Sequence, residues 1–450
     1  MKKSLLALAA LASVASVAHA QDGIQLYGVL DAGVVQATNS GNISPDFVTG
    51  QTPTSAPYLI KNPNLGTVTG MMNGGESATR WGIKGNEDLG QGRKVGFTLE
   101  SGFSINNGQL ATSGLAGSSN VYSNADTSLN GQLFGRQAHL DLSDPTYGML
   151  QIGRVYNVQA DIITGGYDPV DFQMFSPINF SGSYGGAGLT DNFRVDNSLK
   201  YIKNYGNYTF KYLHSFGGIS NSYGARSSDQ ASLGYENHRF GVQAAYEYTH
   251  DVSSLGFPGV FTTNPTSGTA PVGGVPLPNS VSATFFDLRS LMLAGKYNFN
   301  SKFTVKGGYE LIQYSAASNY ASADQYLTSI YSYTLSSVAN GYNKTVNVFW
   351  LGGNYNVTDR IKLSAGYYYA AQLPGADAGA LQAGADRYAS LAVEYYISKR
   401  TNFYAAVMND TKTGSEAYYL SGTGAVNNVT SGTAFPSTFN TYGIGVRTKF

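Results

Sequence analysis

Cysteine is absent from the sequence, which excludes a disulfide framework, a zinc knuckle and a thiol nucleophile. Charge is also scarce, because charged residues make up 12% of the 450-residue chain, about half of the roughly 25% found in soluble globular domains. The 28 basic and 28 acidic residues balance each other, so no nucleic-acid partner is expected. What the chain has in abundance is 55 Gly, 34 Tyr and 22 Phe, a composition that favours strands and turns.

Long apolar runs are missing as well, apart from one at the N-terminus. Residues 5–17 carry no charge, follow two lysines and precede an A-x-A cleavage site at 18–20. We therefore expect residues 1–20 to be a secretory signal peptide and residues 21–450 to be the mature chain. No other stretch approaches the length of a membrane-spanning helix, so the exported chain should be soluble or an outer-membrane β-barrel.

Alternating apolar and polar residues run through the rest of the chain. Near the C-terminus, large apolar side chains occupy every second position from Tyr442 to Val446, with glycines between them. Because successive side chains of a strand point to opposite faces, this pattern predicts a strand with two different faces. The same alternation recurs at 94–103, 302–311, 361–369 and 390–398.

Two kinds of connection join the predicted strands. Seven are tight polar turns, at 88–91, 143–146, 204–206, 236–239, 299–301, 357–359 and 398–401. Eight are long stretches rich in Gly, Ser, Thr and Asn, at roughly 37–77, 104–131, 156–192, 217–227, 251–285, 315–343, 372–385 and 412–439. Short turns at one end and long loops at the other are typical of outer-membrane barrels. The sequence therefore predicts an all-β, transmembrane, antiparallel barrel of sixteen strands with both termini at the short-turn end.

Tyrosines fall near the ends of several predicted strands, at Tyr27, Tyr201, Tyr297, Tyr355 and Tyr442. Amphipathic rings in these positions would form the aromatic girdles found where a membrane meets water. The general preference of tyrosine for strands is the alternative explanation for each ring.

Several motifs together resemble, in their order along the chain, the general porins of beta-proteobacteria. These are RWGIKGNEDLG at 80–90, FTLE at 97–100, FGRQA at 134–138, GR at 153–154, RVDNSLKY at 194–201 and the C-terminal residues 442–450. The resemblance covers the whole mature chain. It implies a sixteen-stranded, trimeric porin in the Gram-negative outer membrane, whose third loop folds into the lumen. A porin is a passive channel for ions and small hydrophilic solutes, so the resemblance implies no catalysis and no cofactor.

The resemblance also implies particular partners. A homotrimer would be surrounded by outer-membrane lipid and lipopolysaccharide, with the loop 104–131 as a candidate latch onto a neighbouring subunit. The C-terminal strand, with Tyr442 and the terminal Phe450, resembles the signal that the barrel-assembly machinery reads.

Basic residues on the inward face of the predicted strands are candidates for the wall of a pore constriction. Trp81 and Ile83 take the lipid face, so Arg80 and Lys84 are expected to face the lumen. Alternation places Arg194 inward in the same way. A charge on the lipid side near the bilayer midplane would cost about 2–4 kcal/mol.

Arg136 does not fit this rule. Its parity matches that of Phe134 and Leu140, which would point it toward lipid. Either a bulge resets the register or the arginine lies near the rim, and the resemblance places it on the lumen wall. Arg154, at the end of the strand before the third loop, is a further candidate for the same cluster.

The third loop, at about 156–192, carries Asp161, Asp168 and Asp171. The resemblance implies that acids of this loop face the arginine wall, and by position Asp168 and Asp171 match those acids best. Two such surfaces would set up a transverse field that aligns dipolar solutes and sets ion preference. We therefore expect selection by size and by this field, with a weak preference for anions.

Other functions compete with this one. The tyrosine run at 367–369 would suit the aromatic slide of a solute-specific channel for sugars or organic acids, and the long loops would suit an adhesin or a phage receptor. An enzyme is not expected, because the histidines at 139, 214, 238 and 250 lie in no catalytic context. No His or Asp spacing predicts a metal site.

Overall fold

The computed structural model describes residues 23–40, 66–106, 108, 110, 133–172, 175–176, 194–218, 221, 223–225, 227–250, 254–258, 280–284, 286–316, 345–373, 383–414 and 438–450. The expected signal peptide at 1–20 and most of the candidate latch at 104–131 lie outside these residues. Both stay predictions.

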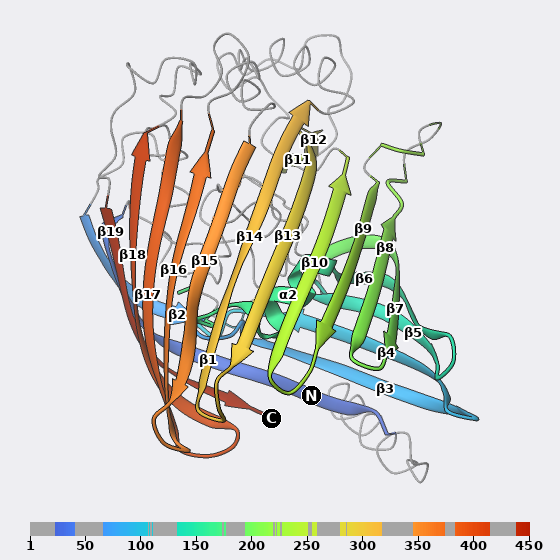
Figure 1. Ribbon diagram of the computed structural model, residues 1–450, viewed down its shortest axis with the longest axis horizontal. Helices are drawn as coiled ribbons and strands as arrows, with labels where there is room; N and C mark the ends of the chain where they lie inside the picture. The colour runs from blue at the N-terminus through green and yellow to red at the C-terminus, as the bar shows by residue number, and fades with distance from the viewer. Residues whose placement is uncertain are drawn as a thin grey trace, which may run out of the picture.

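The strands form one closed antiparallel barrel with sixteen positions, which confirms the predicted fold (Figure 1). The barrel strands are β1 (Gln25–Ser40), β2 (Gly66–Asn73), β3 (Arg80–Gly90), β4 (Arg93–Gly102), β5 (Gln137–Asp144), β6 (Gly148–Tyr156), β7 (Arg194–Tyr205), β8 (Tyr208–Ser215), β9 (Ser228–Glu236), β10 (Phe240–Thr249), β13 (Phe286–Asn298), β14 (Phe303–Ala316), β15 (Thr345–Asn356), β16 (Ile361–Gln372), β17 (Gly384–Tyr396), β18 (Thr401–Gly414) and β19 (Thr438–Lys449). The first and last strands close the barrel, with Val29 opposite Lys449 and Ala37 opposite Thr441.

β2 and β3 share one position in the barrel. β3 pairs with residues 25–29 of β1, and β2 pairs with residues 32–40 of the same strand. Residues 74–79, which we call the inner turn, separate the two strands. The predicted loop over 37–77 is therefore wrong at both ends. β1 is long enough to pair with both strands in turn, so the backbone groups of β2 also find partners.

A second predicted loop also holds strands. β11 (Ser254–Pro258) and β12 (Ser280–Thr284) lie within 251–285 and form a separate antiparallel hairpin, with Ser254 opposite Thr284. Pairing with each other satisfies backbone groups that the barrel ladder leaves out.

All seven predicted short turns are present, and they lie at one end of the barrel (Figure 1). The start of β1 and the C-terminus lie at the same end. The backbone N–H of Phe450 donates to the carbonyl oxygen of Gly28, and the N–H of Gly28 donates back, each over 3.1 Å. The last residue of the chain is thus part of the seam that closes the barrel.

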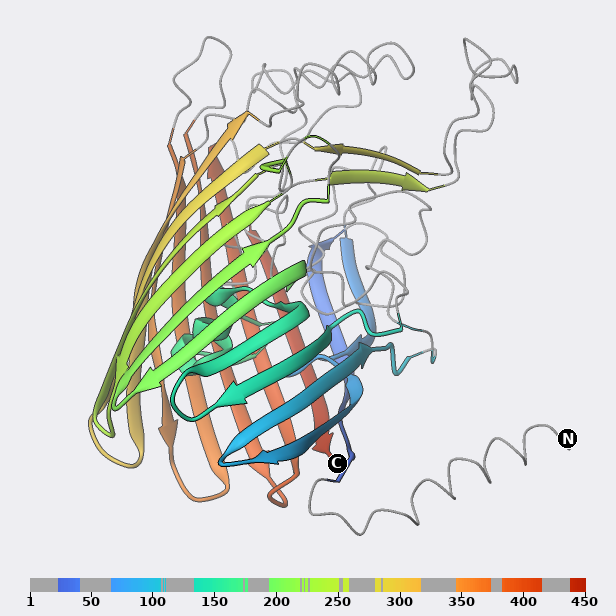
Figure 2. The same cartoon turned by 90° about the vertical axis from the view of Figure 1, so that its right-hand side faces the viewer.

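The barrel wall has two unequal sides (Figure 2). The strands β3 to β9, which we call the short wall, have 8–12 residues each. The strands β13 to β19, which we call the tall wall, have 12–14 residues each. Among the described residues, no helix has both the length and the apolar character needed to cross a membrane.

Apolar side chains alternate outward along both walls. Examples that are exposed on the outer face are Leu140, Leu142, Leu233, Leu293, Leu351, Leu391 and Ile444. Aromatic rings follow one another near the short turns, with ring centroids 5.0 Å apart for Tyr208 and Tyr235 and 4.8 Å apart for Tyr297 and Phe299. Tyr27 departs from the predicted girdle, because its hydroxyl donates inward to Glu100 over 3.1 Å.

The third loop folds into the barrel, as predicted. After β6 the chain forms α2 (Val158–Ile162), whose N-cap Asn157 accepts a hydrogen bond from the backbone N–H of Ala160, and then the π-helical turn η2 (Ile163–Tyr167). The main apolar core lies between this loop and the inner face of the wall; its loop residues are Val158, Ile162, Ile163, Tyr167, Val170, Phe172 and Phe175.

Glycines on the tall wall make room for this loop. A Cβ at Gly352 would lie 2.8 Å from the Cβ of Pro169, and a Cβ at Gly366 would lie 2.8 Å from a methyl group of Val170. The loop therefore packs directly on the backbone of β15 and β16.

Candidate pore constriction

Arg80, Arg136 and Arg194 come together on the short wall, as predicted. Glu100 binds the first two, with 2.7 Å from its Oε1 to Nε of Arg136 and 3.3 Å from its Oε2 to Nε of Arg80. The hydroxyl of Tyr156 accepts hydrogen bonds from Nη2 of Arg136 over 3.0 Å and of Arg194 over 3.3 Å. We call these three arginines the arginine cluster. The single carboxylate of Glu100 is thus shared by two guanidinium groups, which leaves an excess of positive charge between them.

The parity problem of Arg136 is resolved by the start of its strand. β5 begins at Gln137, so Arg136 precedes the extended segment and its side chain is not bound by alternation. Its backbone N–H donates to the carbonyl oxygen of Glu100 over 3.1 Å, which turns the residue toward β4. Leu140 points outward, as its parity requires. The pairing of β5 with β4 shows no bulge, so Arg136 escapes the alternation because it precedes the strand.

The other two basic candidates lie beside the cluster. Nζ of Lys84 is 5.2 Å from the ring centroid of Tyr27, nearer the short-turn end of β3. Arg154 is buried, and its Nη1 donates to Oδ1 of Asp196 over 2.6 Å while its Nε donates to the carbonyl oxygen of Gly135.

Asp161, the first of the loop acids, binds lysines of the short wall. Its Oδ2 lies 2.5 Å from Nζ of Lys200 on β7 and 2.7 Å from Nζ of Lys211 on β8. Burial acts to raise the pKa of Asp161, but these two ammonium groups outweigh it and hold that pKa below its usual value. Asp161 is therefore negatively charged, and the two lysines that bind it more than offset this charge.

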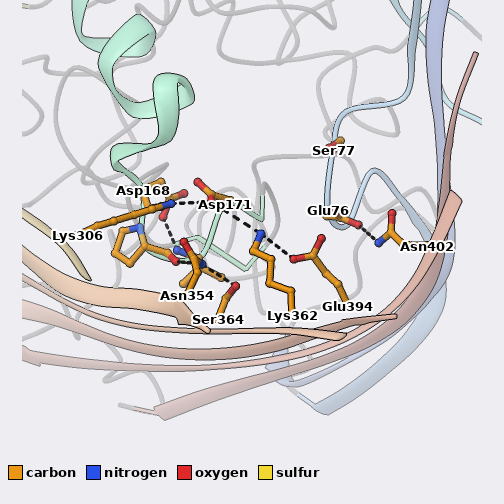
Figure 3. Close-up of polar contacts among 12 residues, drawn as sticks. Glu76, Ser77, Asp168, Asp171, Lys306, Asn354, Lys362, Ser364, Glu394 and Asn402 are labelled. Carbon is orange, nitrogen blue, oxygen red and sulfur yellow. Dashed lines mark hydrogen bonds and ion pairs between the residues drawn. The ribbon is translucent and has the colours of Figure 1, made fainter. Parts of the chain in front are cut away.

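Asp168 and Asp171 anchor the loop to the tall wall (Figure 3). Nζ of Lys306 lies 2.7 Å from Oδ2 of Asp171 and donates to the carbonyl oxygen of Asp168 over 2.8 Å. Asp168 accepts a 2.5 Å hydrogen bond from the hydroxyl of Tyr368. Burial and then the neighbouring Asp171 raise the pKa of Asp168. Nζ of Lys362 lies 4.0 Å from Oδ2 of Asp171.

The structure thus brings the three wall arginines together but pairs the loop acids with lysines. Alternation had already placed Glu100 on the inward face of its strand, so it could have been proposed as the partner of Arg80. The same signal marks Lys306 and Lys362 as inward. Periodicity tells which face a residue is on, and it does not tell which loop residue will meet it.

A profile of Gram-negative porins matches residues 7–415 of the chain. The chain belongs to the family of Gram-negative porins. This porin is 30% identical over 230 residues to an outer membrane porin protein of Bordetella pertussis, covering 51% of this chain and 50% of that protein. It is 25% identical over 241 residues to outer membrane porin protein 32 of Delftia acidovorans, covering 52% of each. The chain matches about half the length of these curated relatives.

Solved structures show the same fold. An anion-selective porin from Comamonas acidovorans superposes with a TM-score of 0.63 at 17% identity, over 96% of this chain and 100% of that chain. The outer-membrane-expressed OmpT of Vibrio cholerae superposes with a TM-score of 0.55 at 14% identity, over 96% and 99% of the two chains. Family and barrel place this porin in the outer membrane.

The tyrosine run at 367–369 does not line the lumen of this porin as a slide. Tyr367 is half-exposed on the outer face, whereas Tyr368 is buried beneath the third loop, where it binds Asp168. Within the described ranges, no group of three or more His, Asp or Glu side chains is placed to hold a metal ion.

Proposed function

We propose that this porin forms a water-filled channel through the outer membrane for passive diffusion of ions and small hydrophilic solutes. The closed barrel, with a third loop that narrows its lumen, supports this function. No catalysis is part of it. The working unit is a homotrimer, and an in-vitro folded OmpT of similar fold is described in a trimer form.

The arginine cluster is the feature that supports a preference for anions. Positive charge exceeds negative charge there, since Glu100 is shared by Arg80 and Arg136. The loop acids Asp161 and Asp171 do not cancel this positive charge, because each is already paired with lysine. Asp161 binds Lys200 and Lys211, and Asp171 binds Lys306. A field of fixed charges inside low-dielectric walls acts strongly on ions that have lost part of their water. The channel therefore prefers anions weakly.

One solved porin of similar fold agrees with this sign, because the protein from Comamonas acidovorans is described as anion-selective. We carry that property over as part of the proposal. Asp168 and Asp171 lie at the tall wall, where Lys306 and Lys362 offset the charge of Asp171, so the field in this proposal arises mainly from the arginine cluster.

Planar-bilayer recording of the refolded mature chain tests the proposal. Discrete steps in groups of three, with linear current–voltage behaviour and a reversal potential of anion-selective sign under a KCl gradient, are the expected result. Saturable current with one solute would support a solute-specific channel instead. A folded barrel without steps would overturn the channel function.

A further inference from the structure

The inner turn, residues 74–79, is a feature that the strand pattern did not predict. It leaves the sheet between β2 and β3 and lies inside the barrel (Figure 3). Phe403 and Val446 are exposed on the outer face, so their neighbours Asn402 and Arg447 point inward. Glu76 of the inner turn binds both of these inward residues, with 2.7 Å from its Oε2 to Nδ2 of Asn402.

A single buried side chain holds this turn in place. Asp31 of β1 is fully buried, and its Oδ2 accepts hydrogen bonds from the backbone N–H of Glu76 over 2.9 Å and of Ser77 over 2.6 Å. Its Oδ1 accepts the hydroxyl of Tyr404 over 2.6 Å. A carboxylate that accepts several hydrogen bonds at once holds its donors in a narrow range of positions.

The backbone of the same residue holds both ends of the turn. The N–H of Gly74 donates to the carbonyl oxygen of Asp31 over 2.9 Å. The hydroxyl of Thr79 donates to that oxygen over 3.0 Å, and the N–H of Asp31 lies 3.2 Å from Oγ1 of Thr79. The beginning, middle and end of the inner turn are therefore all bound to one residue.

The end of the turn leads directly into the arginine cluster. Arg80 follows Thr79 as the first residue of β3, and its Nη1 donates back to the carbonyl oxygen of Ala78 over 2.9 Å. The guanidinium is thus held by the turn on one side and by Glu100 on the other. A movement of the turn would move the guanidinium of Arg80 relative to the other two arginines.

The turn also reaches the anchor of the third loop. The carboxyl group of Glu76 contacts the guanidinium of Arg447 and also faces Glu394 of the tall wall. Figure 3 shows Glu394, Lys362, Asp171 and Lys306 following one another along that wall. Nζ of Lys362 lies 2.8 Å from Oε2 of Glu394 and 4.0 Å from Oδ2 of Asp171. The inner turn therefore lies between the arginine cluster and the loop acids.

We propose that Asp31 is a positioning residue for ion selectivity, because it fixes the inner turn and through it the guanidinium of Arg80. The inner turn is then a second element of the constriction, beside the third loop. This inference rests on the proposed function, in which the arginine cluster sets the ion preference. It adds a residue outside the cluster whose loss changes selectivity without removing any positive charge from the pore.

The test compares four variants by reversal potential in a KCl gradient, using only channels that assemble as heat-modifiable barrels. Asp31→Ala removes the carboxylate, and Thr79→Val removes the hydroxyl that binds the backbone of Asp31. Arg80→Ala removes the arginine itself. Asp144→Ala is the matched control, because Asp144 also accepts two backbone N–H groups, from Thr146 over 2.7 Å and Tyr147 over 3.0 Å, at the short-turn rim.

Asp31→Ala is expected to lower the ratio of chloride to potassium permeability by at least half of the fold-change seen in Arg80→Ala. Thr79→Val should lower it less, in the same direction, and Asp144→Ala should leave it unchanged. A merely structural role for Asp31 would reduce the yield of barrels and leave the ratio of those that assemble at the wild-type value.

The outcomes separate the inference from the proposed function. If Arg80→Ala changes the ratio while Asp31→Ala and Thr79→Val do not, the positioning role is overturned and the proposed function stands. If Arg80→Ala also leaves the ratio unchanged, both are overturned. Should Asp31→Ala give no barrels, Thr79→Val decides alone.

Discussion

The short wall and the tall wall treat inward-facing charge in different ways. On the short wall Arg80 and Arg136 share the one carboxylate of Glu100, so positive charge is in excess there. On the tall wall Lys306 and Lys362 are each paired with a carboxylate, that of the loop residue Asp171 and that of Glu394. Charge that is matched ion by ion can be buried in a protein, whereas an excess is costly to bury without water or mobile ions nearby. The difference indicates that the arginine cluster faces the solute path. The third loop is held by both walls, at Asp161 on the short wall and at Asp168 and Asp171 on the tall wall.

The seam between β1 and the C-terminal end of the chain should give the largest effect. Deleting Phe450 removes two backbone hydrogen bonds to Gly28 and leaves the N–H and C=O groups of Gly28 without these partners. Each unsatisfied backbone group there costs several kcal/mol, so the amount of assembled barrel should fall about tenfold or more. The amount of assembled barrel is measured as the intensity of the heat-modifiable band in gels of outer-membrane fractions.

Phe299→Ala is the control for that deletion, because it removes an exposed ring at the same end of the barrel and leaves the seam paired. Wild-type amounts of the shortened chain in the outer membrane would contradict the role of Phe450 in assembly.

Lys306→Glu tests whether the tall wall holds the loop. The change places a carboxylate against Asp171 and removes the bond to the carbonyl oxygen of Asp168. Lys306 is buried but the side chain of Asp171 is 34% exposed, and hydrogen bonds to charged groups of this kind contribute about 1.5–3 kcal/mol. We expect barrels that unfold at lower temperature and single-channel steps spread over a wide range. Lys302→Glu, on an exposed turn, should show neither change, and uniform steps in Lys306→Glu would refute the anchoring role.

Arg136→Ala tests whether the short wall sets the ion preference. The ratio of anion to cation permeability should fall about threefold, which corresponds to a free-energy change of about 0.7 kcal/mol. Glu100→Gln should raise the ratio, because it removes the carboxylate that Arg80 and Arg136 share. Reversal potentials of both variants in a KCl gradient give the answer. Equal permeability ratios in the two variants would show that charge in the arginine cluster does not set the ion preference.

Glu76 should make the preference depend on pH. Burial raises its pKa to about 8, with Glu394 adding to the rise and Arg447 opposing it; Asn402 also faces its carboxyl group, and Asp31 binds its backbone. A raised pKa means a neutral group below pH 8 and a new negative charge above it. The ratio of anion to cation permeability should therefore fall about twofold between pH 6 and 9.5, which corresponds to about 0.4 kcal/mol. Glu76→Gln should show a flat profile, and an unchanged slope in that variant would rule Glu76 out as the titrating group.

The smallest effect is expected at the rim of the short wall. Arg93 pairs with Asp144 over 3.1 Å, and the arginine is more than half exposed. Exposed ion pairs contribute about 0–1 kcal/mol. Arg93→Ala should thus leave the thermal stability and the reversal potential within error of the wild type. A shift of the reversal potential by Arg93→Ala would extend the selective surface beyond the arginine cluster.

Much of the fold could be predicted because the period of two is a direct consequence of strand geometry. Sixteen strands, seven short turns and an inward third loop all followed from alternation, turn residues or resemblance. The inner turn could not be found that way, because its small and polar residues resemble those of an ordinary loop. What makes it a turn inside the barrel is Asp31, more than 40 residues earlier in the chain.

The arginine cluster was predictable in membership and the loop contacts were not. Parity identified Arg80 and Arg194, and resemblance supplied Arg136, whose backbone leaves the strand pattern. The lysines that meet Asp161 and Asp171 come from β7, β8 and β14. Such partners depend on how the loop crosses the lumen, which is a property of three-dimensional packing.

The glycines beneath the third loop show where the calibre of this pore can be changed. Val170 rests on Gly366, where a Cβ would lie 2.8 Å from a methyl group of the valine. A side chain introduced at Gly366 would push the loop away from the tall wall and narrow the passage. Gly352 is different, because a Cβ there would clash with the carbonyl oxygen of Ala365 and would disturb the pairing of β15 with β16. Pore width can therefore be tuned from β16, at a position that carries no charge.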